Sequence, residues 1–386
     1  MTNKNYPVYK KYWCVEPRDT ALFRDARPFG AGEAASSLPF PWPSTIAGFT
    51  RSRLGMSADH KFEWTPAQAR AVAVAGPWLV ELEASEEIVK DHLFPAPRDA
   101  VFFRVEGNEG QLIRRRLAPR AQREDEWSDL PEGKQLVGFA RDPGETPGKP
   151  ARGPAMWNAD TLQTWLNEPD AHDEEQVMRD GVGMDALPRE RRTHVKIDYK
   201  TQTAETGALF QTEQLRFERY DAKQGVVRRF ALGVATQADN VDDERMSTST
   251  SATGSLGGER RMASVYRIQD ALPLTCPELG DDEEIIRVVL LTPAIFEAGY
   301  CPSAKGLGDD VKVIAAATDR FQAVSGWCFE KRGPKPTRYM APAGSVYWLR
   351  IPGGAAAWAT DRHLTCISDD PQDRLDGFGL IAIGRA

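Results

Sequence analysis

Arginines gather beside a predicted helix start near the beginning of the sequence, and this combination suits a phosphate group. Arg24 and Arg27 precede Ser44 and Thr45, where PWPSTIAGFTRSRLG predicts the start of a helix with Ser44 as its N-cap. Backbone N–H groups and the helix dipole attract an anion there, and guanidinium groups add bidentate contacts. Arg51 lies one or two turns further along the same helix. An ordinary capped helix with a solvated basic face explains these residues equally well, so both interpretations stay open.

A second candidate is the sequence LGGERRMAS. Gly257 and Gly258 allow the backbone to come close to a ligand. Arg260 and Arg261 then supply positive charge and planar groups that can stack on bases. The alternative is a tight turn followed by a strand, with Glu259 pairing one of the arginines.

Two further motifs carry weaker signals. The sequence KPTR places Lys335 and Arg338 just before a predicted strand. The GFG of Gly377–Gly379 precedes the last predicted strand, and a lone pair of glycines there is often only a turn.

No catalytic or metal-binding motif accompanies these basic segments. The sequence contains no HExxH, GxSxG, Walker A or GxGxxG pattern and no CxxC pair. We therefore predict no metal site and no cofactor, and we assign no catalytic residue, because in so acidic a chain any two carboxylates can be nominated for acid–base chemistry. The scattered histidines and cysteines are His60, His92, His172, His194, His363, Cys14, Cys276, Cys301, Cys328 and Cys366.

Composition limits the class of protein. A chain of 386 residues exceeds the ~250–300 residues at which one core stops growing, so two domains are expected. The net charge of −7 argues against a protein that coats nucleic acid unspecifically but allows a narrow basic groove. The sequence shows neither a signal peptide nor an apolar run of ~18 residues, so we predict a cytoplasmic protein without a membrane span.

The elements that must position the basic residues are mostly strands. Strands are predicted from Tyr12 toward Phe23, with a turn at Pro17, and through Trp78, Val80 and Leu82, where apolar residues alternate with others. The helix after Ser44 carries apolar residues at helical spacing and ends at Gly55. Strands mixed with few short helices indicate an α+β fold. The other predicted elements are a hairpin through QLRFE and FALGV with its turn at Gly225, and strands in IIRVVLL, VKVIAAA, SVYWLRI and GFGLIAIGRA.

Residues from about 105 to 190 differ in composition from the rest of the sequence. They include a Gly/Pro-rich stretch, one short helix near Leu162–Leu166 and the acidic run DAHDEE, and we interpret them as long inserted loops. The arginines there suggest an extra RNA clamp, a partner-docking arm or a solvated loop, and the solvated loop is favoured. These arginines are Arg114, Arg115, Arg116, Arg120, Arg123, Arg189, Arg191 and Arg192.

Taken together, seven segments in this order resemble a known family of CRISPR proteins. The family is the RAMP-superfamily subunit of type III-B (Cmr) effector complexes that holds the 5′ end of the guide RNA. The matching segments are FRDARPFG (23–30), PWPSTIAGFTRSRLG (41–55), FPAPRD (94–99), VKIDYKTQTAETGALFQTEQLRF (195–217), LGGERRMASV (256–265), LTPAIFEAGYCP (291–302) and SGWCFEKRGPKPTRYMAPAGSVYWL (325–349).

The resemblance implies a fold and a set of partners. It implies two ferredoxin-like, RRM-like βαββαβ domains, at 1–270 with the insertion at about 105–190 and at 271–386. It also implies a non-catalytic subunit of a hetero-oligomeric antiviral ribonucleoprotein. Such a subunit binds the 5′ tag of the crRNA and bridges the large polymerase/cyclase-like subunit to the backbone RAMP subunits. The residues expected to face RNA are Arg24, Arg27, Ser44, Thr45, Arg51, Gly257, Gly258, Arg260, Arg261, Lys335 and Arg338.

Two other functions remain open at this stage. Some RAMP proteins cleave precursor repeat RNA, and His60, which follows the predicted helix, would then be the candidate base. The chain could instead be the equivalent tag-binding subunit of a type III-A complex, or a bridging protein with little RNA contact. Its acidic runs ELGDDEE and QADNVDDER would suit a basic neighbour.

Overall fold

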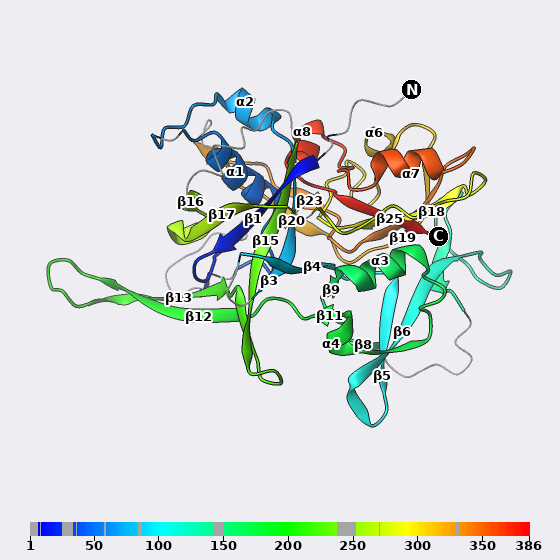
Figure 1. Ribbon diagram of the computed structural model, residues 1–386, viewed down its shortest axis with the longest axis horizontal. Helices are drawn as coiled ribbons and strands as arrows, with labels where there is room; N and C mark the ends of the chain where they lie inside the picture. The colour runs from blue at the N-terminus through cyan, green and yellow to red at the C-terminus, as the bar shows by residue number, and fades with distance from the viewer. Residues whose placement is uncertain are drawn as a thin grey trace.

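Strands dominate the architecture of the protein (Figure 1). The computed structural model describes residues 7, 9–24, 34–35, 37–57, 59–83, 87–141, 150–237, 252–269, 271–328 and 332–386. Within these residues the helices are few and short, and nearly all neighbouring strands run antiparallel. The predicted α+β class is confirmed.

The largest sheet in the described residues has nine strands and lies in the first 270 residues. The strand predicted through Trp78, Val80 and Leu82 is confirmed as β3 (Val74–Leu82), and all nine of its residues are buried. Trp78 and Val80 face a core shared with the second half of the chain, whereas Leu79 faces the core under helix α1. The strand order is β11 (Gly183–Met184), β9 (Met156–Asn158), β4 (Val89–Pro95), β3 (Val74–Leu82), β15 (Val226–Gln237), β1 (Tyr9–Pro17), β17 (Met262–Ile268) and β16 (Ala252–Ser255), with β14 (Glu218–Asp221) paired to β15.

A four-stranded sheet organises the last hundred residues. All four strand predictions in this region are confirmed. In the first half, the hairpin predicted with its turn at Gly225 is confirmed as β14 and β15. The strand order is β19 (Lys312–Ala317), β24 (Val346–Arg350), β18 (Ile285–Leu290) and β25 (Ile381–Arg385). Two short pairs, β20 (Gln322–Val324) with β23 (Arg338–Met340) and β21 (Trp327–Cys328) with β22 (Gly333–Pro334), continue one into the other.

The segment at about 105–190 is not a set of loops, so that prediction is wrong. It supplies most of a five-stranded sheet and helix α3, whose Trp165 and Leu166 are fully buried in the core shared with the second half. The apolar residues are few, but they concentrate on α3 and β9, where together they fill a core. The strand order is β10 (Glu175–Met178), β6 (Asn108–Arg120), β5 (Ala100–Val105) and β8 (Pro150–Ala151), with β7 (Leu136–Phe139) paired to β6.

Three consecutive arginines of β6 are buried and not solvated. Arg114, Arg115 and Arg116 are only 3–4% exposed. Strand β10 and the residues just before it carry their partners, because the acidic run DAHDEE folds against β6. We call this group the buried arginine cluster; its ion pairs are Arg114–Glu175, Arg115–Asp173, Arg115–Glu174 and Arg116–Asp170.

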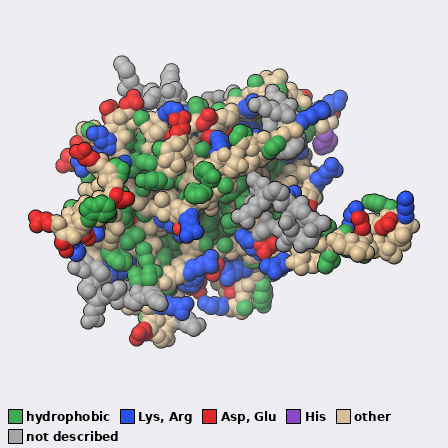
Figure 2. Space-filling model, turned by 180° about the vertical axis from the view of Figure 1, so that it is seen from behind, with side chains coloured by type: hydrophobic (Ala, Val, Ile, Leu, Met, Phe, Trp, Pro, Cys, Tyr) green, Lys and Arg blue, Asp and Glu red, His purple; other side chains and the backbone are tan. Residues whose placement is uncertain are grey.

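A long hairpin, β12 (Arg189–Ile197) with β13 (Ala204–Leu215), projects from the body as an arm. Figure 2, seen from behind, shows the arm standing clear of the rest of the molecule. The helices are α1 (Pro43–Leu54), α2 (Pro66–Ala71), α3 (Ala159–Asn167), α4 (Arg179–Val182), α6 (Ala304–Leu307), α7 (Ala356–Arg362) and α8 (Pro371–Leu375). None of the described helices has the length and apolar character needed to span a membrane.

Candidate nucleic-acid interface

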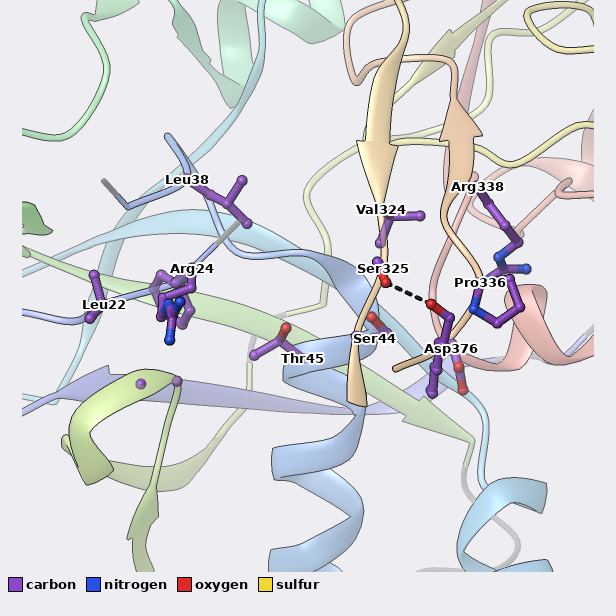
Figure 3. Close-up of a pocket in the computed structure, with 15 residues that line it drawn as sticks. Leu22, Arg24, Leu38, Ser44, Thr45, Val324, Ser325, Pro336, Arg338 and Asp376 are labelled. Carbon is purple, nitrogen blue, oxygen red and sulfur yellow. Dashed lines mark hydrogen bonds between the residues drawn. The ribbon is translucent and has the colours of Figure 1, made fainter. Parts of the chain in front are cut away.

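A cleft of about 740 Å³ lies where the first and second halves of the chain meet. Figure 3 shows helix α1 on one side of it and the β20–β23 hairpin on the other. Its volume is within the range of ~300–1,000 Å³ typical of ligand sites. The cleft is lined by Leu22, Phe23, Arg24, Leu38, Ser44, Thr45, Gly257, Gly258, Val324, Ser325, Gly326, Lys335, Pro336, Arg338 and Asp376.

The N-terminus of α1 opens on the cleft, but its cap differs from the prediction. The helix begins at Pro43, and the N-cap is Trp42, which makes no side-chain cap hydrogen bond. Proline fits the first helical position because its fixed φ suits the helix and its missing N–H costs nothing there. Ser44 and Thr45 therefore lie inside the first turn. The N–H of Thr45 donates to the carbonyl oxygen of Trp42 at 3.0 Å, so the N–H of Ser44 and the helix dipole are what this turn offers to an anion. The predicted end at Gly55 is confirmed.

The turn of the GGERR sequence forms one edge of the cleft. Gly257 has φ +73°, and a Cβ at this position would lie 2.5 Å from the carbonyl oxygen of Leu22. The N–H of Gly258 donates to that same oxygen at 2.7 Å. Glu259 and Arg260 also adopt positive φ, at 57° and 52°. Consecutive residues in this sparsely populated region persist only where surrounding contacts hold them.

The two arginines of this turn take different positions. Arg261 pairs with Glu259 at 3.0 Å and with Asp19 at 3.4 Å, so its guanidinium is held by the protein. Arg260 is exposed and lies beside the cleft but not among the residues that line it. Gln214, fully buried, donates to Glu259 at 3.1 Å and so ties the turn to strand β13.

The β20–β23 hairpin carries the remaining predicted cations. The hydroxyl of Ser325 donates to the backbone oxygen of Lys335 at 2.8 Å, the bond drawn in Figure 3. Lys335 is exposed. Arg338 donates to both oxygens of Asp373, at 2.6 and 2.9 Å. Burial raises the pKa of Asp373, and the Arg338 guanidinium opposes that rise.

Arg51 is placed inside the protein, not in the cleft. It is 8% exposed, and it donates to the carbonyl oxygens of Val72 and Leu375 as well as to Asp376, at 2.5–3.0 Å. These contacts do not support direct contact of Arg51 with RNA. They instead give it a structural role, because it joins α1 to the end of α8 and holds Asp376 at the cleft.

The structure thus brings together seven of the eleven residues predicted to bind RNA, from segments more than 300 residues apart. They are Arg24, Ser44, Thr45, Gly257, Gly258, Lys335 and Arg338. Arg27 lies outside the described residues. His60, the candidate base of the nuclease alternative, is in an exposed turn and does not line the cleft.

Sequence reasoning missed Asp376 and the apolar part of the lining. Leu38 is partly exposed at the cleft, whereas Leu22, Phe23 and Val324 line it as core residues that are only 2–5% exposed. Their spacing in the sequence marks them only as ordinary core residues. Asp376 follows a short helix and carries no motif, so no local signal distinguishes it.

Comparison with known proteins places the chain in one family. The family model described as "CRISPR-associated protein (Cas_Cmr3)" matches residues 13–386. This match confirms, at the level of the family, the resemblance found in the sequence. No curated protein matches the chain.

Several solved structures share a more distant likeness. A chain in the cryo-EM structure of the type III-B Cmr-β complex bound to cognate target RNA and AMPPnP is 16% identical, with a TM-score of 0.48, over 88% of this chain and 86% of that one. A chain of the Csm3–Csm4 subcomplex of the type III-A interference complex is 9% identical, with a TM-score of 0.35, over 88% and 92%. A CRISPR protein from Archaeoglobus fulgidus is 9% identical, with a TM-score of 0.27, over 97% and 98%. Because these scores are low, the assignment rests on the family model.

Proposed function

The chain belongs to the Cas_Cmr3 family of CRISPR-associated proteins, and on that basis we propose that it binds the 5′ tag of the crRNA in the cleft. In this function it is a non-catalytic subunit of a type III-B ribonucleoprotein. It bridges the large polymerase/cyclase-like subunit to the backbone RAMP subunits, and it works in the cytoplasm.

The observation that carries this proposal is the composition of the cleft. Arg24 and Lys335 supply positive charge from two distant segments of the chain, and the first turn of α1 supplies the backbone N–H of Ser44. Leu38 adds apolar surface next to these polar groups. Single-stranded RNA needs both kinds of contact, because cations and N–H groups hold phosphates while apolar or aromatic surfaces receive unstacked bases.

The turn at Gly257 supports the same interpretation. Its backbone comes so close to Leu22 that only glycine fits, and the next two non-glycine residues are strained. Strain of this kind is often kept where a ligand is bound. The turn therefore suits a fixed edge against which a phosphate or base is placed.

Strand order supports the two ferredoxin-like domains that we propose as the framework. In the first half the sheet has the strand order β17-β1-β15-β3, and α1 lies between β1 and β3 in the chain. In the second half the sheet has the strand order β25-β18-β24-β19, and α7 and α8 lie between β24 and β25 in the chain. Numbered within each half, both orders read fourth, first, third, second, as expected of a βαββαβ unit. We keep the boundary between residues 270 and 271 as part of this proposal.

The test is a binding measurement on the full chain with three labelled RNAs at two salt concentrations. One RNA carries the repeat-derived 5′ tag, the second has that tag scrambled, and the third is uncut precursor repeat. We expect tighter binding of the tagged RNA, a steep loss of affinity with salt, and no cleavage. Equal binding of the tagged and scrambled RNAs would contradict tag recognition, and cleavage of the precursor would support a nuclease instead.

A lone subunit could also lack part of the site. If none of the RNAs binds, the same measurement is made on the assembled complex with wild-type protein and with a variant lacking Arg24 and Lys335. Assembly and tag binding that are unaffected by the two substitutions would leave only a bridging role.

A further inference from the structure

One carboxylate lies among the cations of the cleft. Asp376 follows α8, and its side chain is 17% exposed. Its Oδ1 accepts hydrogen bonds from Arg51 at 2.5 Å and from Gln372 at 3.0 Å. No group in the described part of the chain donates to Oδ2. Since Asp376 lines the cleft, this oxygen is the acceptor that it offers to a ligand.

A carboxylate in this position divides the cleft into two chemically different sides. It repels a phosphate, and the repulsion is strong where solvent is partly excluded. A phosphate is therefore favoured away from Asp376, near Arg24 and the turn at Gly257. The side formed by Asp376 is suited to groups that donate hydrogen bonds.

Nucleobases differ in whether they can donate to such an oxygen. Adenine, cytosine and guanine carry an exocyclic amino group, and carboxylates accept from amino groups of this kind. Uracil carries none, and its N3–H lies between two carbonyl oxygens that a carboxylate repels. An acid at the base-binding side therefore discriminates against uracil.

We propose that Asp376 determines base specificity: its Oδ2 accepts a hydrogen bond from the exocyclic amino group of a nucleobase bound in the cleft. This inference rests on the proposed RNA-binding function and adds the class of base that the site takes. Arg51 positions the acceptor, because its guanidinium can only donate and so keeps Oδ1 turned away from the ligand.

The contact with Arg51 makes one substitution especially informative. In Asp376→Asn the amide oxygen must face Arg51, since two donors cannot pair, and the NH₂ group then points where Oδ2 was. The cleft would present a donor in place of an acceptor, with almost no change in shape. Asp370→Asn is the matched control, because it removes the same charge from the same helix. Asp370 caps α8, and asparagine caps equally well.

The experiment measures the affinity of the full chain for three labelled eight-nucleotide RNAs. These are an adenosine oligomer, the same oligomer with purine riboside, which lacks the amino group, and a uridine oligomer. For the wild-type protein and Asp370→Asn we expect the adenosine oligomer to bind about tenfold tighter than the other two. For Asp376→Asn this preference should disappear, with uridine now binding as well as adenosine or better.

The possible failures are distinguishable. If the wild-type protein binds neither these RNAs nor the RNA with the 5′ tag, alone or in the assembled complex, the proposed function itself is overturned. If it binds the tagged RNA but none of the three oligomers, only the role of Asp376 is overturned. If it binds adenosine and purine riboside oligomers equally, or if Asp376→Asn keeps the adenosine preference, only the role of Asp376 is overturned. Comparison of adenosine with purine riboside uses wild-type protein, so it decides the question even if the variant does not fold.

Discussion

Two groups of basic residues in this protein look alike in the sequence and differ in the structure. The buried arginine cluster lies on one strand, β6, and each of its arginines meets a carboxylate of the acidic run at 170–175. The basic residues of the cleft, Arg24, Lys335 and Arg338, come from two distant segments and converge on a space of about 740 Å³. A run of arginines is therefore a poor guide to an RNA site unless the position of the nearest carboxylates is known.

The surroundings of the two groups explain the difference. Arg114 lies over the rings of Trp157 and Trp165, at 5.5 and 5.0 Å from their centroids, and pairs with Glu175. Burial without an ion partner would be costly for such a group, so its charge is committed to the fold. In the cleft, Lys335 is exposed on a hairpin that faces a cavity. Its charge is accessible to a ligand.

Arg51 and Arg338 lie between these extremes. Arg338 lines the cleft, but both of its terminal nitrogens donate hydrogen bonds to the carboxylate of Asp373. Arg51 is fully engaged behind the cleft wall. Of the two, we expect only Arg338 to influence a bound RNA directly, and less strongly than Lys335 because its donors are already in use.

The largest effect should come from the buried pair next to the arginine cluster. Asp99 and Arg287 are both fully buried and form an ion pair, and Asp99 also accepts from Trp165 at 2.9 Å. Asp99→Ala leaves the guanidinium without its counter-charge, so we expect a loss of about 3–5 kcal/mol in the free energy of unfolding. Urea denaturation followed by tryptophan fluorescence measures it.

A surface pair provides the control for this prediction. Arg98 and Asp319 pair at 2.9 Å, with side chains 46% and 59% exposed. Asp319→Ala should cost no more than about 1 kcal/mol, because exposed pairs are weak. Similar losses for the two variants would show that the Asp99–Arg287 pair is not a determinant of stability.

The sequence predicted the elements better than their environment. Strand positions in the second half follow from continuous apolar runs such as IIRVVLL, and α1 follows from apolar residues at helical spacing with Gly55 at its end. The fold of residues 105–190 was missed because burial there depends on pairing across distance. Arg116 and Asp170 are 54 positions apart and meet only after β6 and the acidic run fold together.

The candidate site shows the same limit. Glycines and cations with distinctive local motifs, such as Gly257 and Lys335, could be named in advance. Asp376 could not, since its significance comes from contact with Arg51, 325 positions away. The burial of Arg51 could not be predicted for the same reason, because its partners Val72, Leu375 and Asp376 are distant in the sequence.

An intermediate effect is expected for the cations of the cleft. Arg24→Ala combined with Lys335→Ala should weaken RNA binding by about tenfold to a hundredfold at low salt, since two charge-assisted contacts are lost. The slope of log affinity against log salt should become shallower by about 1.4, because each of the two lost phosphate contacts contributes ~0.7 to the slope for single strands. Stability should be unchanged. Fluorescence anisotropy across a salt series measures both quantities.

Two exposed lysines outside the cleft make a matched control. Lys61→Ala with Lys312→Ala removes the same charge from positions that do not line the cavity. This variant should keep nearly all the affinity and the wild-type salt slope. If both double variants lose affinity equally, general electrostatics and not the cleft would account for the binding.

The smallest effect concerns pH and separates stability from RNA binding. His363 is neutral in the fold: Nδ1 accepts from the N–H of Ile383 at 3.2 Å, and Nε2 is 3.1 Å from the carbonyl oxygen of Leu274, to which it donates. Burial lowers the pKa of His363 below its ordinary 6.5. The unfolded chain therefore takes up a proton near pH 6.5, whereas the folded chain does so only at lower pH. Stability should be constant above this range and fall as the pH drops through 6.5.

His363→Gln should flatten this pH dependence, because glutamine can keep both hydrogen bonds without titrating. Urea denaturation at pH 7.5 and pH 5.5 compares the variant with wild-type protein, and His60→Gln, at an exposed turn, serves as the control. RNA affinity of all three proteins should change equally between pH 7.5 and 6, since His363 does not line the cleft. If the RNA affinity instead followed the titration of His363, the surroundings of His363 and the cleft would be coupled, and stability and RNA binding could not be treated as independent.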